Sequence, residues 1–182
     1  LKTAFKTRNG RTVYDGYGIE PDVEVEQEYM SALAVALIQK SLIFDYATAF
    51  CKSHPSIAPA SEFIITDEIY NDFRNFLSDK EYAYSTSTEK YLDELKAIAK
   101  EEKYYEAVEK DIAALESKLK NDKADDLNKY RQEISEMLKS EILSRYYYQK
   151  GRIEGSLSDD KDVLKAIEIL SDKAQYNKIL GR

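Results

Sequence analysis

The sequence predicts a mainly α protein, a helical bundle domain preceded by an N-terminal β-hairpin and edge-strand segment. Apolar residues recur at helical spacing through most of the chain after about residue 28. The preceding residues instead form short strand-like runs separated by Asn-Gly, Gly and Pro. Hydrophobic residues make up 43% and charged residues 34% of the 182 residues, a balance that excludes a disordered chain. We therefore divide the chain into a β segment, residues 1–28, and a C-terminal helical domain, residues 29–182.

The β segment begins with a predicted hairpin. Asn9-Gly10 lies between the runs Thr3–Arg8 and Arg11–Asp15 and is the preferred pair for a two-residue type I′ turn, in which both residues need positive φ. A two-residue loop sets the register, with the pairs Arg8–Arg11, Thr7–Thr12, Lys6–Val13 and Phe5–Tyr14.

A glycine-rich exit follows the hairpin. Gly16 and Gly18 allow a sharp bend or a close backbone approach. Glu20 precedes Pro21 and is biased toward extended backbone. Val23–Val25 is then predicted to form a short final strand.

Composition excludes several functional classes. The net charge of −7 argues against nucleic acid as a main partner. A single cysteine, Cys51, excludes an internal disulfide and a cysteine-based zinc site. The chain contains no Gly-x-Ser-x-Gly elbow, no His-Glu-x-x-His motif, no phosphate loop and no dinucleotide fingerprint.

The helical domain begins with the most apolar stretch, residues 29–51. Its apolar residues occupy more than one helical face, which predicts a largely buried helix. Gln39, Lys40 and Asp45 interrupt it and disfavour a membrane span, which needs about 20 mostly apolar residues.

A loop with two prolines, His54–Pro59, follows this helix. His54 is the single histidine of the chain, and a Ser-His-Asp site would need it. No nucleophile motif accompanies it, so a plain loop role is favoured over catalysis or metal binding.

Two short extended segments and two helices come next. Glu62–Ile65 is predicted to be a short strand or an extended lead-in, and Tyr82–Tyr84 a strand that pairs with it. Thr66 is predicted to cap a helix that runs to about Ser78, and Ser87 or Thr88 to cap another that ends near Glu102.

Two long helices follow, and we expect them to form an antiparallel hairpin. The first carries a heptad-like seam at Val108, Ile112, Leu115 and Leu119. A break is predicted at Asn121–Lys123, and the second helix continues its stripe from Leu127 toward Tyr146.

The run Tyr146–Tyr148 covers nearly all sides of a helix. One interpretation is docking onto another domain or subunit; the favoured one is a helix end packed on the bundle with a partly wet ring. Gly151 and Gly155 are expected to end that helix. Ser158 is expected to cap a last helix with Asp159, Asp160 and Asp162 in its first turn, and a tail turn is predicted around Tyr176–Leu180.

Several sequence blocks resemble the carboxyl-terminal processing peptidases, also called tail-specific proteases, of serine peptidase family S41. The blocks Gly10-Arg11-Thr12-Val13 and Gly18-Ile19-Glu20-Pro21-Asp22-Val23-Glu24-Val25 are similar to the end of that family's catalytic domain. The blocks Phe44–Ala47, His54–Pro59 and Ser144–Arg152 resemble the tail of its Bacteroidetes-type members. The resemblance covers nearly the whole chain.

The resemblance implies proteolysis by a longer parent protein. The family's nucleophilic serine, its activating lysine and the usual PDZ domain all precede the Gly-Ile-x-Pro-Asp segment, so we expect this chain to be a C-terminal piece without the catalytic pair. No catalytic, cofactor-binding or metal-binding residue, and no cofactor, is therefore assigned to it. The implied partners are the upstream peptidase core, the PDZ domain, protein substrates and further copies of the chain, in the periplasm or cell envelope. The alternative is a non-enzymatic helical module that binds proteins.

Overall fold

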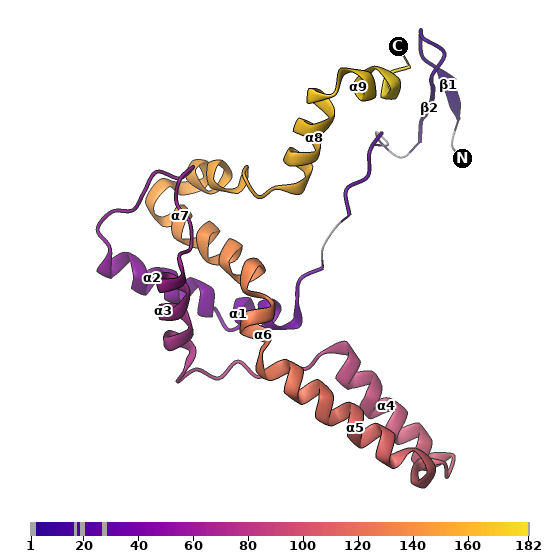
Figure 1. Ribbon diagram of the computed structural model, residues 1–182, viewed down its shortest axis with the longest axis vertical. Helices are drawn as coiled ribbons and strands as arrows, with labels where there is room; N and C mark the ends of the chain where they lie inside the picture. Colours follow the sequence, from indigo (N-terminus) through magenta and orange to yellow (C-terminus); the bar gives the residue numbers. More distant parts are fainter. Residues whose placement is uncertain (1–2, 17, 19–20, 27–28, 182) are drawn as a thin grey trace. The chain divides into compact units, whose positions relative to one another are not determined.

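The computed structural model describes residues 3–16, 18, 21–26 and 29–181. Within that range the chain is mainly α, as predicted, with nine helices and one two-stranded antiparallel sheet (Figure 1). It forms two compact units. The larger is Tyr29–Gly155, and the smaller combines the described residues of Leu1–Glu28 and Ser156–Arg182.

The strands and helices of the described residues have the following bounds. The strands are β1 (Ala4–Lys6) and β2 (Thr12–Tyr14). The helices are α1 (Ala32–Gln39), α2 (Leu42–Ser53), α3 (Asp67–Leu77), α4 (Ser87–Glu101), α5 (Tyr105–Ala124), α6 (Asp126–Lys129), α7 (Arg131–Ser156), α8 (Lys161–Ser171) and α9 (Lys173–Ile179).

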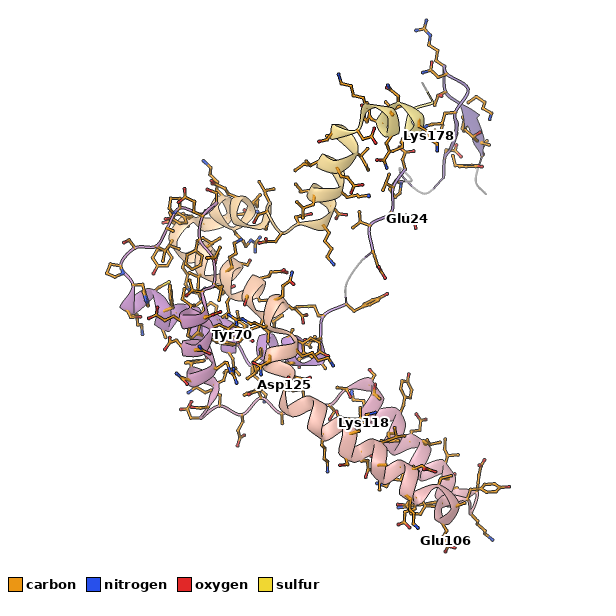
Figure 2. All side chains as sticks on the ribbon, viewed as in Figure 1. Glu24, Tyr70, Glu106, Lys118, Asp125 and Lys178 are labelled. Carbon is orange, nitrogen blue, oxygen red and sulfur yellow. The ribbon has the colours of Figure 1, made fainter. Side chains whose placement is uncertain are left out.

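The core of the larger unit joins α1, α2, α3 and the first half of α7. Tyr70 of α3 lies in this core, where its hydroxyl donates to the carbonyl of Leu127 at 2.5 Å (Figure 2). Burial raises the pKa of the Tyr70 phenol. The buried cluster consists of Leu33, Leu37, Leu42, Ile43, Tyr46, Ala47, Phe50, Ala60, Phe63, Tyr70, Phe73, Leu77, Ile134, Leu138, Ile142 and Leu143.

The prediction of one continuous buried helix over residues 29–51 was wrong, because this stretch forms two helices. Ser41 has a φ of 58° and separates α1 from α2, which are bent by 64°. The bend explains why apolar residues occupied more than one helical face, because each helix turns a different face to the core. No single helix among the described residues is long and apolar enough to cross a membrane; α1 and α2 meet the criterion only when taken together across their bend.

The two predicted strands of the helical domain are not formed. Residues 63–66 run as an extended lead-in to α3, which was the alternative reading of this segment, and residues 81–86 are irregular. Phe63 is buried in the core and Tyr82 and Tyr84 pack against it, so hydrophobic packing rather than a backbone ladder places these segments.

The helix caps agree closely with the sequence. Thr66 caps α3 as predicted, accepting a hydrogen bond from the Ile69 amide. The cap of α4 is Thr86 rather than Ser87 or Thr88. Thr86 and Glu89 form a capping box, in which two backbone amides are satisfied reciprocally, and this favours the earlier start.

The predicted hairpin between the two long helices is not formed, because α5 pairs with α4 instead (Figure 1). The three-residue loop Glu102–Tyr104 reverses the chain, with Lys103 in the left-handed region at φ 63°. Ile112, from the predicted seam, is buried, and Lys96 of α4 lies 2.5 Å from Glu116 of α5.

The break predicted at Asn121–Lys123 lies further on, because α5 continues to Ala124 and is followed by the single turn α6. Asp126 of α6 is buried and accepts a hydrogen bond from the Tyr84 hydroxyl at 2.5 Å. Burial and this hydrogen bond raise the pKa of the Tyr84 phenol.

Gly151 and Gly155 do not end their helix, contrary to the prediction. Both lie inside α7 and are buried; the helix changes direction earlier, at Tyr148, where φ is 57° and ψ is −158°. The kink brings the following turn close to the preceding one. A Cβ atom at Gly155 would lie 2.2 Å from Leu143 Cδ1 and 3.1 Å from the Ala60 carbonyl oxygen, so the two glycines permit a close approach.

In the smaller unit the β-hairpin forms with a register shifted by one residue from the prediction. Phe5 lies opposite Val13, Lys6 opposite Thr12 and Ala4 opposite Tyr14. A shift of one residue moves each side chain of one strand to a new partner and face.

The register differs because the loop contains three residues rather than two. The Gly10 amide donates to the Thr7 carbonyl at 2.9 Å, and the Thr7 amide donates to the Arg11 carbonyl at 2.8 Å. Gly10 has a φ of 82°, whereas Asn9 is not among the residues with positive φ. A loop in which only the last residue has a left-handed conformation is typical of a three-residue hairpin. The type I′ turn is excluded, because it needs positive φ at both of its central residues.

Val23–Val25 does not form the predicted final strand. A strand requires a hydrogen-bonded neighbour, and β1 and β2 pair only with each other within the described residues. The segment is held by a side chain instead. Asp22 lies 2.8 Å from the Arg11 guanidinium, which also donates to the Ile179 carbonyl at 3.1 Å.

The last two helices are present, with caps that differ from the prediction. Asp160, rather than Ser158, caps α8 and accepts from the Val163 amide at 3.0 Å, which leaves Asp162 in the first turn as expected. Asp172 caps α9, which extends the turn predicted around Tyr176. Aspartate accepts from helical amides more strongly than serine because its oxygen is charged.

The buried position of Gly155 leads to a test in which two effects oppose each other. Alanine is favoured over glycine inside a helix by about 1 kcal/mol. Overpacking against Leu143 and the Ala60 carbonyl costs about 1–3 kcal/mol. We expect Gly155→Ala to lower the free energy of unfolding in urea, because the nearest obstacles are a buried side chain and backbone. Glu154→Ala, at an exposed position of the same helix, is the control; equal stability of the two variants would contradict the close packing.

Candidate functional site: an acidic groove beside the proline loop

A groove of about 640 Å³ lies between α2, the connection that follows it and α3. Its lining begins at Tyr46 of α2, continues through residues 53–66 and ends at Asp72 of α3. We call it the acidic groove, and we call residues 54–59 the proline loop. Both features lie in the larger unit.

The floor of the acidic groove is apolar and well ordered by packing. Phe50 and Phe63 are buried there with ring centroids 6.5 Å apart, and Tyr46 meets Phe73 edge-on at 5.1 Å. Edge-to-face aromatic pairs at such distances stabilise a core beyond the area that they bury. The floor is therefore part of the folded core.

The rim of the groove carries three carboxylates and no lysine or arginine. They belong to Glu62 in the lead-in and to Glu68 and Asp72 of α3, which are four residues apart and so share one helical face. Asp72 accepts a hydrogen bond from the Tyr46 hydroxyl at 3.1 Å. The carboxylates of Glu62 and Glu68 have no hydrogen-bond or ion-pair partner among the described residues.

The Tyr46 hydroxyl connects the floor to the rim. It lies 3.0 Å from the Ile69 carbonyl and 3.1 Å from the Asp72 carboxylate. Burial raises the pKa of the Tyr46 phenol, and the charge and hydrogen bond of Asp72 raise it further. The phenol therefore stays protonated across the physiological range.

The proline loop is held from the opposite side by two of the three consecutive tyrosines. Tyr147 donates to the Ala58 carbonyl at 3.0 Å and lies 3.2 Å from the Ile57 carbonyl, and Tyr146 donates to the His54 carbonyl. Burial, together with the neighbouring Cys51 thiol, raises the pKa of Tyr146 to about 12. Tyr148 is 80% exposed. Two of the tyrosines thus pack on the bundle and one ring is exposed to solvent, which agrees with the favoured interpretation of the run.

His54, the candidate weighed for catalysis, stacks on Phe50 with ring centroids 3.9 Å apart. Its Nδ1 lies 2.9 Å from the Phe50 carbonyl and 3.0 Å from Ser53 Oγ. Ser53 Oγ in turn donates to the Phe50 carbonyl at 3.0 Å. Both side chains therefore contact the Phe50 carbonyl at the end of α2. The Ser53 hydroxyl donates to that carbonyl, and no carboxylate among the described residues orients the His54 ring, so a Ser-His-Asp site is not assembled here.

Metal binding has no support from the part of the chain that the structure describes. No group of three or more His, Cys, Asp and Glu side chains there could hold a metal ion. The rim carboxylates of the groove are spread along its length, which suits contact with an extended ligand better than coordination of one ion.

Sequence reasoning did not identify the acidic groove. One signal was present: Glu68 and Asp72 at i, i+4 on a helix whose opposite face carries Tyr70, Phe73 and Leu77. The contribution of Glu62 and of the apolar floor could not be read from spacing, because it depends on how the proline loop folds back.

The described residues thus form a mainly α domain with an acidic groove in its larger unit. A family model described as "Probable PDZ-protease, C-terminal helical domain" matches residues 33–170, well over half of the chain and including the whole acidic groove. The chain belongs to this family. Comparisons with curated proteins and with solved structures find no match.

The raised pKa of Tyr46 predicts how stability depends on alkaline pH. The folded chain keeps this proton at pH values where an unfolded tyrosine, with a pKa of about 10, has lost it. Its contribution is therefore complete below about pH 10 and falls above it, by up to about 1.4 kcal/mol per pH unit. Tyr46→Phe should make the decline between about pH 9 and pH 11 shallower in urea unfolding, while costing about 1 kcal/mol at neutral pH.

Tyr91→Phe is the matched control for this test, because the Tyr91 ring is exposed on α4. It is expected to keep the slope of the parent chain. A slope unchanged in Tyr46→Phe would show that the Tyr46 proton is not linked to folding.

The hydroxyl of Tyr147 is predicted to anchor the proline loop. Tyr147→Phe keeps the ring and removes the donor to the Ile57 and Ala58 carbonyls, so we expect a loss of about 0.5–1.5 kcal/mol in the free energy of unfolding. Amide exchange should accelerate in residues 54–60. Tyr148→Phe, at the exposed position, should change neither quantity; an equal effect in both variants would exclude the anchoring role.

Proposed function

We propose that this chain is the C-terminal region of a serine-type carboxyl-terminal processing endopeptidase of family S41, of the Bacteroidetes type. The observation that carries the proposal is the match of residues 33–170 to the C-terminal helical domain of a probable PDZ-protease, preceded directly by the Gly10–Val13 and Gly18–Val25 blocks. The order of these blocks along the chain supports a peptidase core that ends near residue 28, where the helical domain begins.

In this proposal catalysis belongs to the parent protein. A serine nucleophile attacks the scissile carbonyl while a lysine accepts its proton, and the lysine passes that proton to the amine that leaves. Water then hydrolyses the acyl-enzyme to a carboxylate and regenerates the serine. Both residues belong to the region before the Gly18–Val25 block. The chain described here contributes the end of the catalytic sheet through residues 1–28, and support, substrate access or oligomerisation through residues 29–182. The proposed location is the periplasm or cell envelope.

The exposed hairpin supports a role for residues 1–28 as part of a larger sheet. Each strand has three residues, and Phe5 and Tyr14 are about half exposed. An isolated two-stranded hairpin is marginally stable in water, and its free edges can accept further strands. Upstream strands of a peptidase core would supply that pairing.

The test is to determine the coding sequence upstream of Leu1 and to express the whole protein. We expect a PDZ domain and a Ser/Lys pair there, and hydrolysis of unfolded protein substrates that falls at least about a thousandfold on Ser→Ala at the nucleophile. The 182-residue chain alone should be inactive. An upstream region without the pair would leave the non-enzymatic helical module as the function. Hydrolysis that survives the serine substitution would exclude the serine-type mechanism.

A further inference from the structure

The lead-in to α3 presents an unpaired backbone edge along the acidic groove. Burial alternates along it as in a strand, since Phe63 is buried and Ile65 half-buried while Ile64 is 64% exposed. The amide and carbonyl groups of Ile64 and Ile65 have no hydrogen-bond partner among the described residues. Such an edge is a template for the backbone of another extended segment.

The charge beside this edge is of one sign. Glu62 lies next to it in the chain, and Glu68 and Asp72 face the same groove from α3. Since Glu62 and Glu68 are unpaired and no lysine or arginine lines the groove, the site lacks a compensating cation. A ligand that carries positive charge along its length would supply it.

We propose that the acidic groove binds an extended polypeptide in which apolar and basic residues alternate. Its backbone pairs with the amide and carbonyl groups of Ile64. Its apolar side chains lie against Ile57 and Ile69, which line the groove and are half-buried. Its lysine or arginine side chains reach Glu62 and Glu68. The inference rests on the proposed function in one respect, that an unfolded protein substrate of the parent peptidase is the source of this polypeptide. Binding itself is a property of the 182-residue chain.

The probe is a fluorescein-labelled peptide of alternating valine and lysine, compared with a valine–glutamate peptide of the same length. Fluorescence anisotropy with the 182-residue chain should show binding of the lysine peptide only, weakening as NaCl rises. In the same samples, hydrogen exchange at the Ile64 amide should slow by at least about fivefold when the lysine peptide is present. The Ile65 amide points to the opposite edge of the extended segment and should keep its exchange rate.

The matched variants separate the groove from the general negative charge of the chain. Glu62→Gln with Glu68→Gln removes two unpaired rim charges and should weaken binding at least about tenfold. Glu94→Gln with Glu101→Gln makes the same change of net charge on the exposed face of α4 and should bind as the parent chain does.

Three results would overturn the proposal. The first is equal weakening by the two double variants, and the second is binding without protection of the Ile64 amide. The third is protection that appears without peptide, increases with protein concentration and is accompanied by a doubled mass in sedimentation. That result would show that a second copy of the chain occupies the groove. None of these results bears on the proposed serine-type activity, which is decided by the nucleophile substitution in the whole protein.

Discussion

The packing of α7 against α1, α2, α3 and the proline loop is the interaction on which the larger unit depends. Ile134, Leu138 and Ile142 recur every four residues along its first half and are completely buried. Polar contacts flank this seam at both ends. Glu133 accepts from the Ser31 amide at 2.9 Å, and Arg145 donates to the Phe44 carbonyl at 2.9 Å while its guanidinium lies over the Phe44 ring. A single helix thus aligns elements that are far apart in sequence.

This arrangement positions the walls of the acidic groove. The tyrosines near the end of the α7 seam fix the proline loop, and the buried Tyr46 fixes the position of Asp72 on α3. The carboxylates of Glu62 and Glu68 on the rim have no hydrogen-bond or ion-pair partner among the described residues. A site whose walls are already in place loses little conformational entropy when an extended chain binds, which favours recognition by this domain.

Under the proposed function, the described residues contribute recognition and the parent protein's core contributes bond cleavage. His54 and Ser53 are both committed to the last turn of α2, and the acids of the groove are spread along its rim. A helical domain of this kind complements a peptidase core that carries its own nucleophile. Under the proposed function the core would break the bond, and the helical domain would hold the unfolded chain near it.

Local features of the chain were predictable where a few neighbouring residues decide them. The cap at Thr66, the stripe of α3, the His54–Pro59 loop and the final helices follow from capping chemistry and helical spacing alone. Small errors arose where two local solutions are close in energy. Asn9-Gly10 suits both a two-residue and a three-residue loop, and the structure adopts the one in which only Gly10 takes positive φ.

The sequence by itself therefore determined the mainly α class, the N-terminal hairpin and the helical character of most residues that follow it. Only the tertiary structure decided that residues 29–51 bend at Ser41, that α5 pairs with α4, and that α7 kinks at Tyr148 so that Gly155 meets Leu143. The acidic groove belongs to the second group, since it joins α2, a loop and α3. The physical reason is that helical spacing shows which face of a helix is apolar, whereas the partner of that face depends on packing between residues distant in sequence.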